Sequence, residues 1–575
     1  MTSPTSTDWA ARLGRTSFIE LDARARAVAL LDDGTARELC GPFDRIESPW
    51  LEPQGVVPQS DDGVVVVRGR LDGRAAVVIA IEQAFQGGGI GEVSGVKMAT
   101  ALSLAARDTR AGTPTAAVLL LETGGVRLQE ANLGLATVAE VCSALLELRP
   151  LAPVVGVIAG ALGCFGGVSI AAGLCTKLIM TEEGRLGLNG PEVIQAEAGV
   201  AEFDASDRPL IWSITGGRIR TRTELADELV LDDVDALRSA VIGAVAEGVP
   251  GEHRSQRIGA LRASFEAAGP SGSGDRAEAG DLSRSGGHAE AGDPSGSGDH
   301  AQAGKPPMTR GRAWTLALAD GDVNDAVPSA LTADVTLGDD TACLLAVVPD
   351  PRSPYHRARR GEVGLREGLA LASAVTATVA QDARLPAGRR RPIIALVDLP
   401  SQAYGHVEET LGIHQALAAA VDAYATARTA GHPVIALIVG TALSGGLLTH
   451  GFQANQILAL DDPGVLIHAM HKQAAAQVTL RTVAELDELA KRIPPLSYDV
   501  ADWDRLGLCD ELLTVANADT PAEGDVRKAK EALAAAVARA RQGPLDLSNR
   551  LDSPGARRTR AASRRVREAL TAQWD

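Results

Sequence analysis

The chain contains one strand-and-glycine unit twice, over residues 153–167 and again over residues 433–446. In each copy a proline opens an apolar run, a glycine ends the run seven residues after the proline, and two adjacent glycines follow. The glycine pairs are Gly166 with Gly167 in the first copy and Gly445 with Gly446 in the second. A short apolar run that ends in glycines predicts a buried strand, a tight loop and the start of a helix.

The first turn of a helix presents backbone N–H groups that lack partners within the helix, and these groups can hold a negatively charged oxygen. Glycine suits such a loop because no Cβ atom blocks the approach of a ligand to the backbone. Two copies of the unit therefore predict two related domains and two candidate sites for an anionic oxygen.

The sequence between the two copies predicts a flexible linker over residues 268–307. This segment consists largely of Gly, Ser, Ala, Asp and His, and the hexapeptide PSGSGD occurs in it twice. Few of its side chains can offset the entropy that is lost on ordering. We therefore expect the linker to join a domain of residues 1–267 to a domain of residues 308–575.

Strands alternate with helices in both predicted domains. A second proline-led apolar run precedes each glycine pair, over residues 113–125 and 391–405, and a loop that enters a helix lies upstream of each. This alternation is typical of an α/β fold. Elsewhere, residues 52–80 predict an antiparallel hairpin with its turn at Leu71–Arg74, and residues 525–545 and 556–575 predict helices.

The composition excludes several classes of protein. The formal charge is −17 and aromatic residues make up 3% of the chain, which argues against general binding to nucleic acid or to anionic membranes. Residues 150–176 carry no charge and are long enough to span a bilayer, but their glycines and Pro153 favour a buried strand, loop and helix. We expect a cytoplasmic protein, because the six scattered cysteines and the polar N-terminus indicate neither disulfides nor a signal peptide.

Two loops in each half are candidates for chemistry. In the first half they are residues 122–130 and residues 163–167, which both follow predicted buried strands. Such loops meet at the carboxyl ends of the strands, where α/β folds bind ligands. The N–H groups of Gly125 and Val126 can then converge with those of Gly166 and Gly167 on one oxygen. The alternative is that both loops are ordinary tight turns, but their recurrence in the second half as DLPSQAYG and LSGG favours a site.

Longer stretches carry a family resemblance. TGGVRLQE, GGVSIAAG and LGLNGPEVI resemble the N-terminal carboxyltransferase domain of acyl-CoA carboxylases, which belong to the crotonase superfamily, and the second half resembles the C-terminal domain. FQGGGIGEVSGVKMATAL and GCFGGVSIAAGLC resemble the beta subunit of biotin-independent malonate decarboxylases, and ALSGGLLTHGFQAN and DPGVLIHAMHK resemble the gamma subunit. The resemblance covers roughly residues 15–250 and 310–520, and it implies two crotonase-like α/β domains of ββα repeats in one chain.

The resemblance also has departures. The zinc-ribbon cysteines of some bacterial carboxyltransferase subunits are absent, and no motif surrounds a lysine that biotin could modify. We therefore expect no biotin on this chain. His468 and His471 have the spacing of one helix face but lack a third ligand nearby, so we expect no metal.

The family implies that the enzyme removes CO₂ from a malonyl thioester and leaves an enolate whose charge gathers on the thioester oxygen. Gly125, Val126, Gly166 and Gly167 are then the oxyanion hole, and Gly445 with Gly446 form a second hole that faces it. Tyr404 is a candidate proton donor, although a loop tyrosine also serves in packing. The remaining candidates for substrate binding are Gly124, Gln129, Glu130, Asn189, Gln402 and Ser444. Gln129 and Glu130 equally suit the first turn of a solvated helix, and Asn189 equally suits a helix cap.

The family further implies an acyl carrier protein with a CoA-derived prosthetic group, a separate transferase that loads malonate, and a homo- or hetero-oligomer. The six arginines of residues 557–567 can attract an acidic carrier protein or can belong to a disordered tail. Two rival functions remain, a biotin-dependent carboxyltransferase and a non-catalytic scaffold for the carrier protein. The sequence leaves open whether the paired sites form within a chain or across a dimer, and whether malonyl-CoA replaces the carrier-bound substrate.

Overall fold

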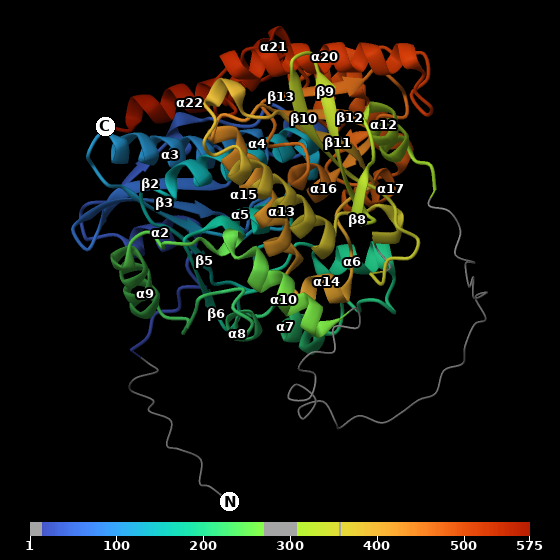
Figure 1. The fold of residues 1–575 in the computed structure, drawn as a ribbon. Helices are drawn as coiled ribbons and strands as arrows, with labels where there is room; N and C mark the ends of the chain where they lie inside the picture. Colours follow the sequence, from blue (N-terminus) through green and yellow to red (C-terminus); the bar gives the residue numbers. More distant parts are fainter. Residues whose placement is uncertain (1–13, 270–306, 356–357) are drawn as a thin grey trace, which may run out of the picture.

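The computed structural model describes residues 14–269, 307–355 and 358–575, so the predicted linker lies almost entirely outside the described residues. Two sheets, one from each half of the chain, form the framework (Figure 1). Helices that flank the sheets bury most of both (Figure 1), which confirms the α/β class. The domain limits at residues 267 and 308 stay predictions.

The first sheet runs in chain order. Its strands are β1 (Arg37–Leu39), β2 (Val64–Leu71), β3 (Arg74–Ile81), β4 (Ala116–Leu120), β5 (Val154–Ile158), β6 (Lys177–Thr181) and β7 (Glu228–Val230). The first three strands pair antiparallel and the others continue in parallel from β3. The hairpin between β2 and β3 is confirmed, since Asp72 and Gly73 in its turn both have positive φ, as a two-residue hairpin turn of type I′ requires.

The second sheet repeats this plan. Its strands are β8 (Asn324–Val327), β9 (Ala330–Leu337), β10 (Asp340–Val347), β11 (Ile393–Leu399), β12 (Val434–Leu443), β13 (Gln456–Leu460), β14 (Ile467–His468) and β15 (Glu511–Leu513). The first three strands are antiparallel and β10, β11, β12, β13 and β15 follow in parallel, with β14 paired to the end of β12. Both sheets thus grow from a hairpin into a parallel set, as related domains should.

The helices fall into pairs that also correspond between the halves. The principal helices are α3 (Glu92–Arg110), α4 (Ala131–Leu148) and α5 (Gly167–Leu174) in the first half, and α13 (Leu365–Gln381), α15 (Ile413–Thr429) and α16 (Ser444–Thr449) in the second. α15 packs on α5 and α4, and α16 contacts the same two helices. The two glycine-pair helices therefore meet at the centre of the interface between the halves.

The remaining helices complete the layers around the two sheets. They are α2 (Ala23–Leu30), α6 (Pro191–Ala198), α7 (Arg208–Thr215), α8 (Gly217–Arg222), α9 (Val234–Glu247), α10 (Ile258–Ala268), α12 (Arg310–Leu318), α14 (His406–Thr410), α17 (Lys472–Val478), α18 (Val483–Ala490), α19 (Val500–Arg505), α20 (Glu523–Gln542), α21 (Pro554–Thr559) and α22 (Ala561–Gln573). The uncharged run 150–176 folds into β5, a loop and α5, as predicted. Among the described residues, one helical stretch (Leu128–Leu148) is long and apolar enough to cross a membrane, and 83% of its apolar 18-residue window is buried inside the protein.

In both repeated units a carboxylate accounts for the glycine that ends the apolar run. The strand β4 is followed by Glu122, which accepts the N–H of Gly160, and a Cβ atom at Gly160 would lie 2.5 Å from Oε2 of Glu122. In the second half Asp398, within β11, occupies the same place, and a Cβ atom at Gly440 would overlap its Oδ1. The glycine at the end of each apolar run thus makes room for an acidic side chain from the neighbouring strand.

The two halves exchange their last helices. In α10 of the first half, Phe265 is buried against the ring of Tyr355, and the helix packs on α13. In return, α22 of the second half packs on α3, with Trp574 fully buried and its indole N–H donating to Asp108 at 2.8 Å. Each half is therefore closed by a helix of the other.

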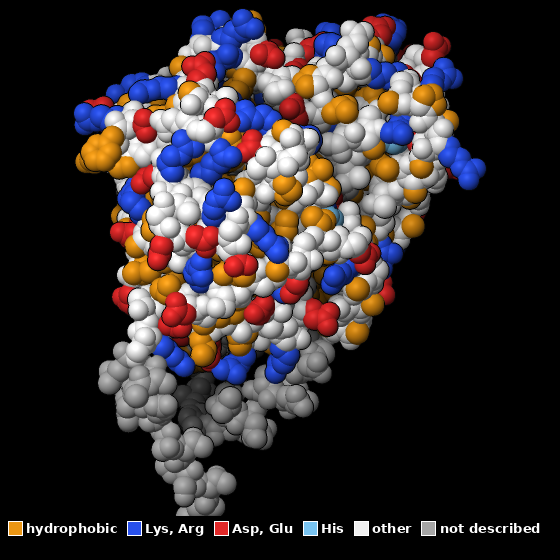
Figure 2. All heavy atoms as spheres, turned by 90° about the vertical axis from the view of Figure 1, so that its left-hand side faces the viewer, with side chains coloured by type: hydrophobic (Ala, Val, Ile, Leu, Met, Phe, Trp, Pro, Cys, Tyr) orange, Lys and Arg blue, Asp and Glu red, His pale blue; other side chains and the backbone are white. Residues whose placement is uncertain are grey.

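The prediction of a disordered tail is wrong, because the arginine-rich segment forms the end of α21 (Pro554–Thr559) and the first half of the docked α22 (Ala561–Gln573). Arg560 and Arg567 both pair with the buried Glu140 of the first half, at 2.9 and 2.5 Å. On the face drawn in Figure 2, basic and acidic side chains are interspersed and form no single basic patch. Part of the basic charge in this segment is therefore neutralised within the molecule.

Candidate active site

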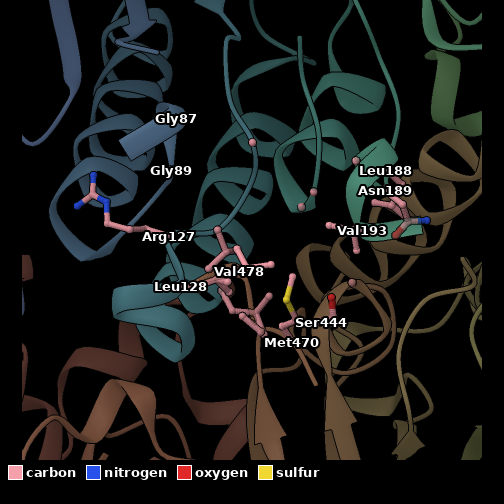
Figure 3. A pocket seen from close by; sticks show the side chains of 18 of the residues that line it. Gly87, Gly89, Arg127, Leu128, Leu188, Asn189, Val193, Ser444, Met470 and Val478 are labelled. Carbon is pink, nitrogen blue, oxygen red and sulfur yellow. The ribbon is translucent and has the colours of Figure 1, made fainter. Parts of the chain in front are cut away.

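A cavity of about 400 Å³ lies between the two halves, and both halves line it (Figure 3). Ten of the predicted site residues lie in its wall: Gly124, Val126, Gln129, Gly166, Gly167 and Asn189 from the first half, and Gln402, Tyr404, Ser444 and Gly445 from the second. In this structure both halves of one chain therefore contribute predicted site residues to the same cavity.

The two first-half loops touch one another. Thr123 and Cys164 form a parallel bridge, so the loops continue the sheet beyond the ends of β4 and β5. Gly166 has a φ of 62°, and a Cβ atom there would lie 2.8 Å from Cα of Gly125, which itself has a φ of 112°. Positive φ and this close approach both require glycine at these positions. Gly125 lies behind Gly166 and does not line the cavity.

The hydrogen bonds of these loops determine which N–H groups remain available. The N–H of Gly125 donates to Oγ1 of Thr123 at 2.9 Å, and the N–H of Gly166 donates to the carbonyl of Leu188 at 2.7 Å. The N–H groups of Val126 and Gly167 donate to no acceptor in the part of the chain that the structure describes, and both residues line the cavity. Gly167 is the first residue of α5, where a helix has no internal acceptor for its N–H.

The second-half pair is held differently. The N–H of Gly445 donates to Oε1 of Gln402 at 2.8 Å, and Nε2 of Gln402 donates to Oδ1 of Asn189 at 2.7 Å. These two hydrogen bonds, made by the side chains of Gln402 and Asn189, link the second glycine pair to the first half. Gly446 does not line the cavity, since its Cα faces the backbone of Ser401, where a Cβ atom would approach the carbonyl to 2.9 Å.

Glu130 is also absent from the cavity wall. Its carboxylate is fully buried and pairs with Arg127 at 2.7 Å, while it also accepts the hydroxyl of Ser48. Burial raises the pKa of Glu130 to about 7, against the opposing effect of Arg127. Arg127 turns its guanidinium away from the cavity toward Asp62 (Figure 3). Both alternatives for Glu130, substrate contact and a solvated helix turn, are thereby replaced by a role in supporting the loop.

Tyr404 is buried in the loop after β11 and lines the cavity. Burial raises the pKa of its phenol well above 10, and hydrogen bonding to Ser401 and Ser444 only partly opposes this shift. The phenol therefore stays protonated at physiological pH, as a proton donor must.

Apolar side chains complete the wall and were missed by sequence reasoning. Leu128, Met470 and Val478 lie on one side, and Leu188 and Val193 on the other (Figure 3). Leu448 of α16 adds to them and lies close to Gly167, where a Cβ atom would approach Leu448 Cδ1 to 2.5 Å. All of them except Val478 lie within the motifs that carry the family resemblance, but their apolar side chains give no chemical signal, so only the packing of the two halves identifies them as cavity wall.

Comparison with known proteins gives the class of the molecule. A carboxyl transferase domain model matches residues 44–250, so the first half has the carboxyltransferase form of the crotonase fold. A model described as the malonate decarboxylase gamma subunit matches residues 358–574, which include the docked α22.

Individual relatives identify the family within this class of enzymes. The malonyl-S-ACP:biotin-protein carboxyltransferase MADC of Malonomonas rubra is 40% identical over 43% of this chain and 80% of its own length. MADD of the same organism, with the same description, is 32% identical over 35% of this chain and 69% of its own length. The chain belongs to the malonate decarboxylase family, with regions that correspond to a beta and a gamma subunit joined in one polypeptide.

Two solved structures are also similar in sequence. A chain of a Pseudomonas malonate decarboxylase hetero-tetramer with malonate is 57% identical, with 47% of this chain and 96% of that chain covered and a TM-score of 0.45. A chain of the Pseudomonas MdcD–MdcE hetero-dimer is 52% identical, with 44% and 96% covered and a TM-score of 0.37.

Proposed function

We propose that the chain decarboxylates a malonyl thioester carried on an acyl carrier protein and releases CO₂ and the acetyl thioester. The observation that carries this proposal is the pair of unengaged N–H groups, on Val126 and Gly167, in the wall of the interdomain cavity. They suit a thioester oxygen that gains negative charge during the reaction. Compared with the sequence-based assignment, the donors are Val126 and Gly167, and Gly125 and Gly166 shape the loops that hold them.

The reaction needs little else from the protein. The bond between the carboxylate carbon and the methylene carbon breaks, its electron pair passes through the methylene carbon onto the thioester oxygen, and CO₂ leaves. Fixed N–H donors stabilise the resulting enolate more than the ground-state carbonyl, which is what raises the rate. Tyr404 then gives its proton to the methylene carbon, and the phenolate regains a proton from solvent.

The apolar wall supports this chemistry. Leu135, Leu188 and Leu448 keep the cavity poor in water, and in a dry site hydrogen bonds to a developing charge are stronger than in water. Gln402 and Ser444 of the second half, with Asn189 of the first half hydrogen-bonded to Gln402, supply polar groups where the departing carboxylate would lie. Gly124 and Gln129 would contact the arm of the thioester.

The proposal includes the partners of the enzyme. The thioester would be formed on the CoA-derived prosthetic group of a carrier-protein subunit, after a separate transferase loads malonate onto it. Relatives named as acting on malonyl-S-ACP support this assignment, as do the hetero-oligomeric relatives. We place the complex in the cytoplasm, since all six cysteines are free and five are buried.

The second candidate function is carboxyl transfer to a biotin protein, which the names of both Malonomonas relatives favour. The two functions differ in where the carboxyl group goes. Purified chain mixed with malonyl-labelled carrier protein should release labelled CO₂ without biotin, and avidin should leave the rate unchanged. Release that depends on a biotin protein and stops with avidin would establish the alternative, and turnover of malonyl-CoA at the same efficiency would remove the carrier protein from the proposal.

A further inference from the structure

A buried carboxylate of the second half holds the catalytic loops of the first. Glu409, on α14, is fully buried and accepts the backbone N–H groups of Leu188 and Asn189, at 3.0 Å on Oε2 and 2.7 Å on Oε1. Oε1 also accepts Nδ2 of Asn189 at 3.0 Å. Each of these three hydrogen bonds crosses from one half of the chain to the other.

We propose that Glu409 is a positioning residue that aligns both glycine loops across the interface between the halves, an inference that rests on the proposed function. The first path runs through Leu188. With its N–H held by Glu409, Leu188 presents its carbonyl to the N–H of Gly166 at 2.7 Å. Gly166 caps α5, so its orientation sets the direction of the next N–H, that of Gly167, into the cavity.

The second path runs through Asn189. Its side chain lies between Glu409 and Gln402, and Gln402 in turn accepts the N–H of Gly445. Nδ2 of Asn189 also donates to the carbonyl of Ala403, next to Gln402. One carboxylate therefore supports the donor of the first half and the glycine loop of the second, although it does not line the cavity itself.

The surroundings of Glu409 fix its place. Arg220, also fully buried, lies 3.9 Å from Oε2 and donates to the backbone carbonyls of Leu186 and of Glu409 itself, at 2.9 Å each. Gly187 leaves the carboxylate room, since a Cβ atom there would lie 2.8 Å from Oε2. Burial raises the pKa of Glu409 and Arg220 opposes the shift. The carboxylate is thus held on both sides, by the first-half N–H groups and by Arg220.

The test is the variant Glu409→Gln, which keeps size but has only one acceptor oxygen. In either orientation its amide N–H₂ meets an N–H donor of Leu188 or Asn189, so the loop must shift. We expect kcat for malonyl carrier protein to fall about 10- to 100-fold with KM changed less than threefold, since a shift of an ångström at a donor costs about that much. The matched control is Asp382→Asn, a buried second-half carboxylate that also accepts a backbone N–H and an arginine, both from Arg391. Arg391 precedes β11, and the site loop follows its other end.

The outcomes separate the two proposals. Wild-type complex without decarboxylase activity would refute the proposed function, whereas active wild type with equal kcat values for Glu409→Gln and Asp382→Asn would refute only the inference. If Glu409→Gln does not fold, Glu409→Asp keeps the charge and is one methylene too short to reach both N–H groups. A folded Glu409→Asp enzyme should show the same selective fall in kcat. Wild-type kcat in that enzyme, or failure of both variants to fold, would assign Glu409 to stability alone.

Discussion

The two glycine-pair loops share a backbone plan but differ in what their N–H groups bind. In the first half, the carbonyl of Leu188 engages Gly166 and leaves the N–H of Gly167 facing the cavity. In the second half, the side chain of Gln402 engages Gly445, the glycine that lines the cavity. The same strand, loop and helix therefore provide an N–H donor without a protein partner in the first copy, which we call the open loop. In the second copy the N–H of Gly445 is held by a side chain, and we call this the braced loop.

This difference teaches that a repeated fold need not repeat its chemistry. A backbone acceptor such as Leu188 fixes a loop without entering the cavity, whereas a side-chain acceptor such as Gln402 occupies the N–H that a ligand would use. The first pair is thus suited to binding an oxyanion, and the second pair to presenting Gln402 and Ser444 toward the carboxylate that leaves. Each prediction below changes one side of this comparison.

The largest effect should come from Gly166→Val in the open loop. A Cβ atom would lie 2.8 Å from Cα of Gly125, and valine does not tolerate a φ of 62°. We expect turnover to fall roughly 10²- to 10³-fold, as for loss of one oxyanion donor. Steady-state CO₂ release by the purified complex measures this. Gly243→Val in α9, where a Cβ atom meets nothing within 4 Å, is the control, and near-normal activity in folded Gly166→Val would contradict the assignment.

The open loop also shows how far sequence reasoning reaches. Its glycines, strand and helix were predictable, because apolar runs and glycines determine local backbone. The choice between Gly166 and Gly167 as donor was not, because it depends on the carbonyl of Leu188, and the motif LGLNGPEVI does not show which N–H that carbonyl accepts. Glu409 was invisible for the same reason: a carboxylate in the sequence HVEET reads as a helix surface until the two halves pack together.

The next largest effect should come from Tyr404→Phe, which removes the proposed proton donor that the second half contributes to the cavity. We expect kcat to fall about 10²-fold, as is usual for loss of a general acid. A donor works only while protonated, and burial raises the pKa of Tyr404 above its ordinary value of 10. The wild-type kcat should therefore not decline between pH 8 and pH 10 on account of this group. Unchanged kcat in Tyr404→Phe would assign the residue to packing, and a wild-type decline below pH 10 that the variant lacks would contradict the raised pKa.

A smaller effect should follow from Gln402→Leu, which removes the side-chain amide that holds the N–H of Gly445. The N–H of Gly445 and Oδ1 of Asn189 would then lose their partner, at a cost of about 1–3 kcal/mol for each buried group left unsatisfied. We expect about a tenfold loss of kcat, less than for Gly166→Val, because the first-half donors remain. Gln402→Glu should recover the Gly445 contact but not the Asn189 contact, and so separates the two. A loss as large as that of Gly166→Val would show that both pairs act as equal oxyanion holes.

The smallest predicted effect is on stability. It follows from a comparison of Glu122 and Asp398, the two carboxylates that lie against Gly160 and Gly440. Asp398 is held at both oxygens, by the N–H of Gly311 at 2.8 Å and that of Thr441 at 3.1 Å. Glu122 uses Oε1 for Gly160, and among the described residues its Oε2 has no hydrogen-bond partner. The longer and less constrained side chain can move away from an added methyl group, and the shorter one cannot.

Gly440→Ala should therefore destabilise the protein more than Gly160→Ala. Overpacking of this kind costs about 1–3 kcal/mol, and we expect the upper part of that range for Gly440→Ala and the lower part for Gly160→Ala. Chemical denaturation of the two variants, with Gly243→Ala as the control in open space, measures the difference. Equal costs would mean that Glu122 is as rigidly held as Asp398. A larger cost for Gly160→Ala would mean that the first half, which supplies the open donors, is also the more tightly packed copy.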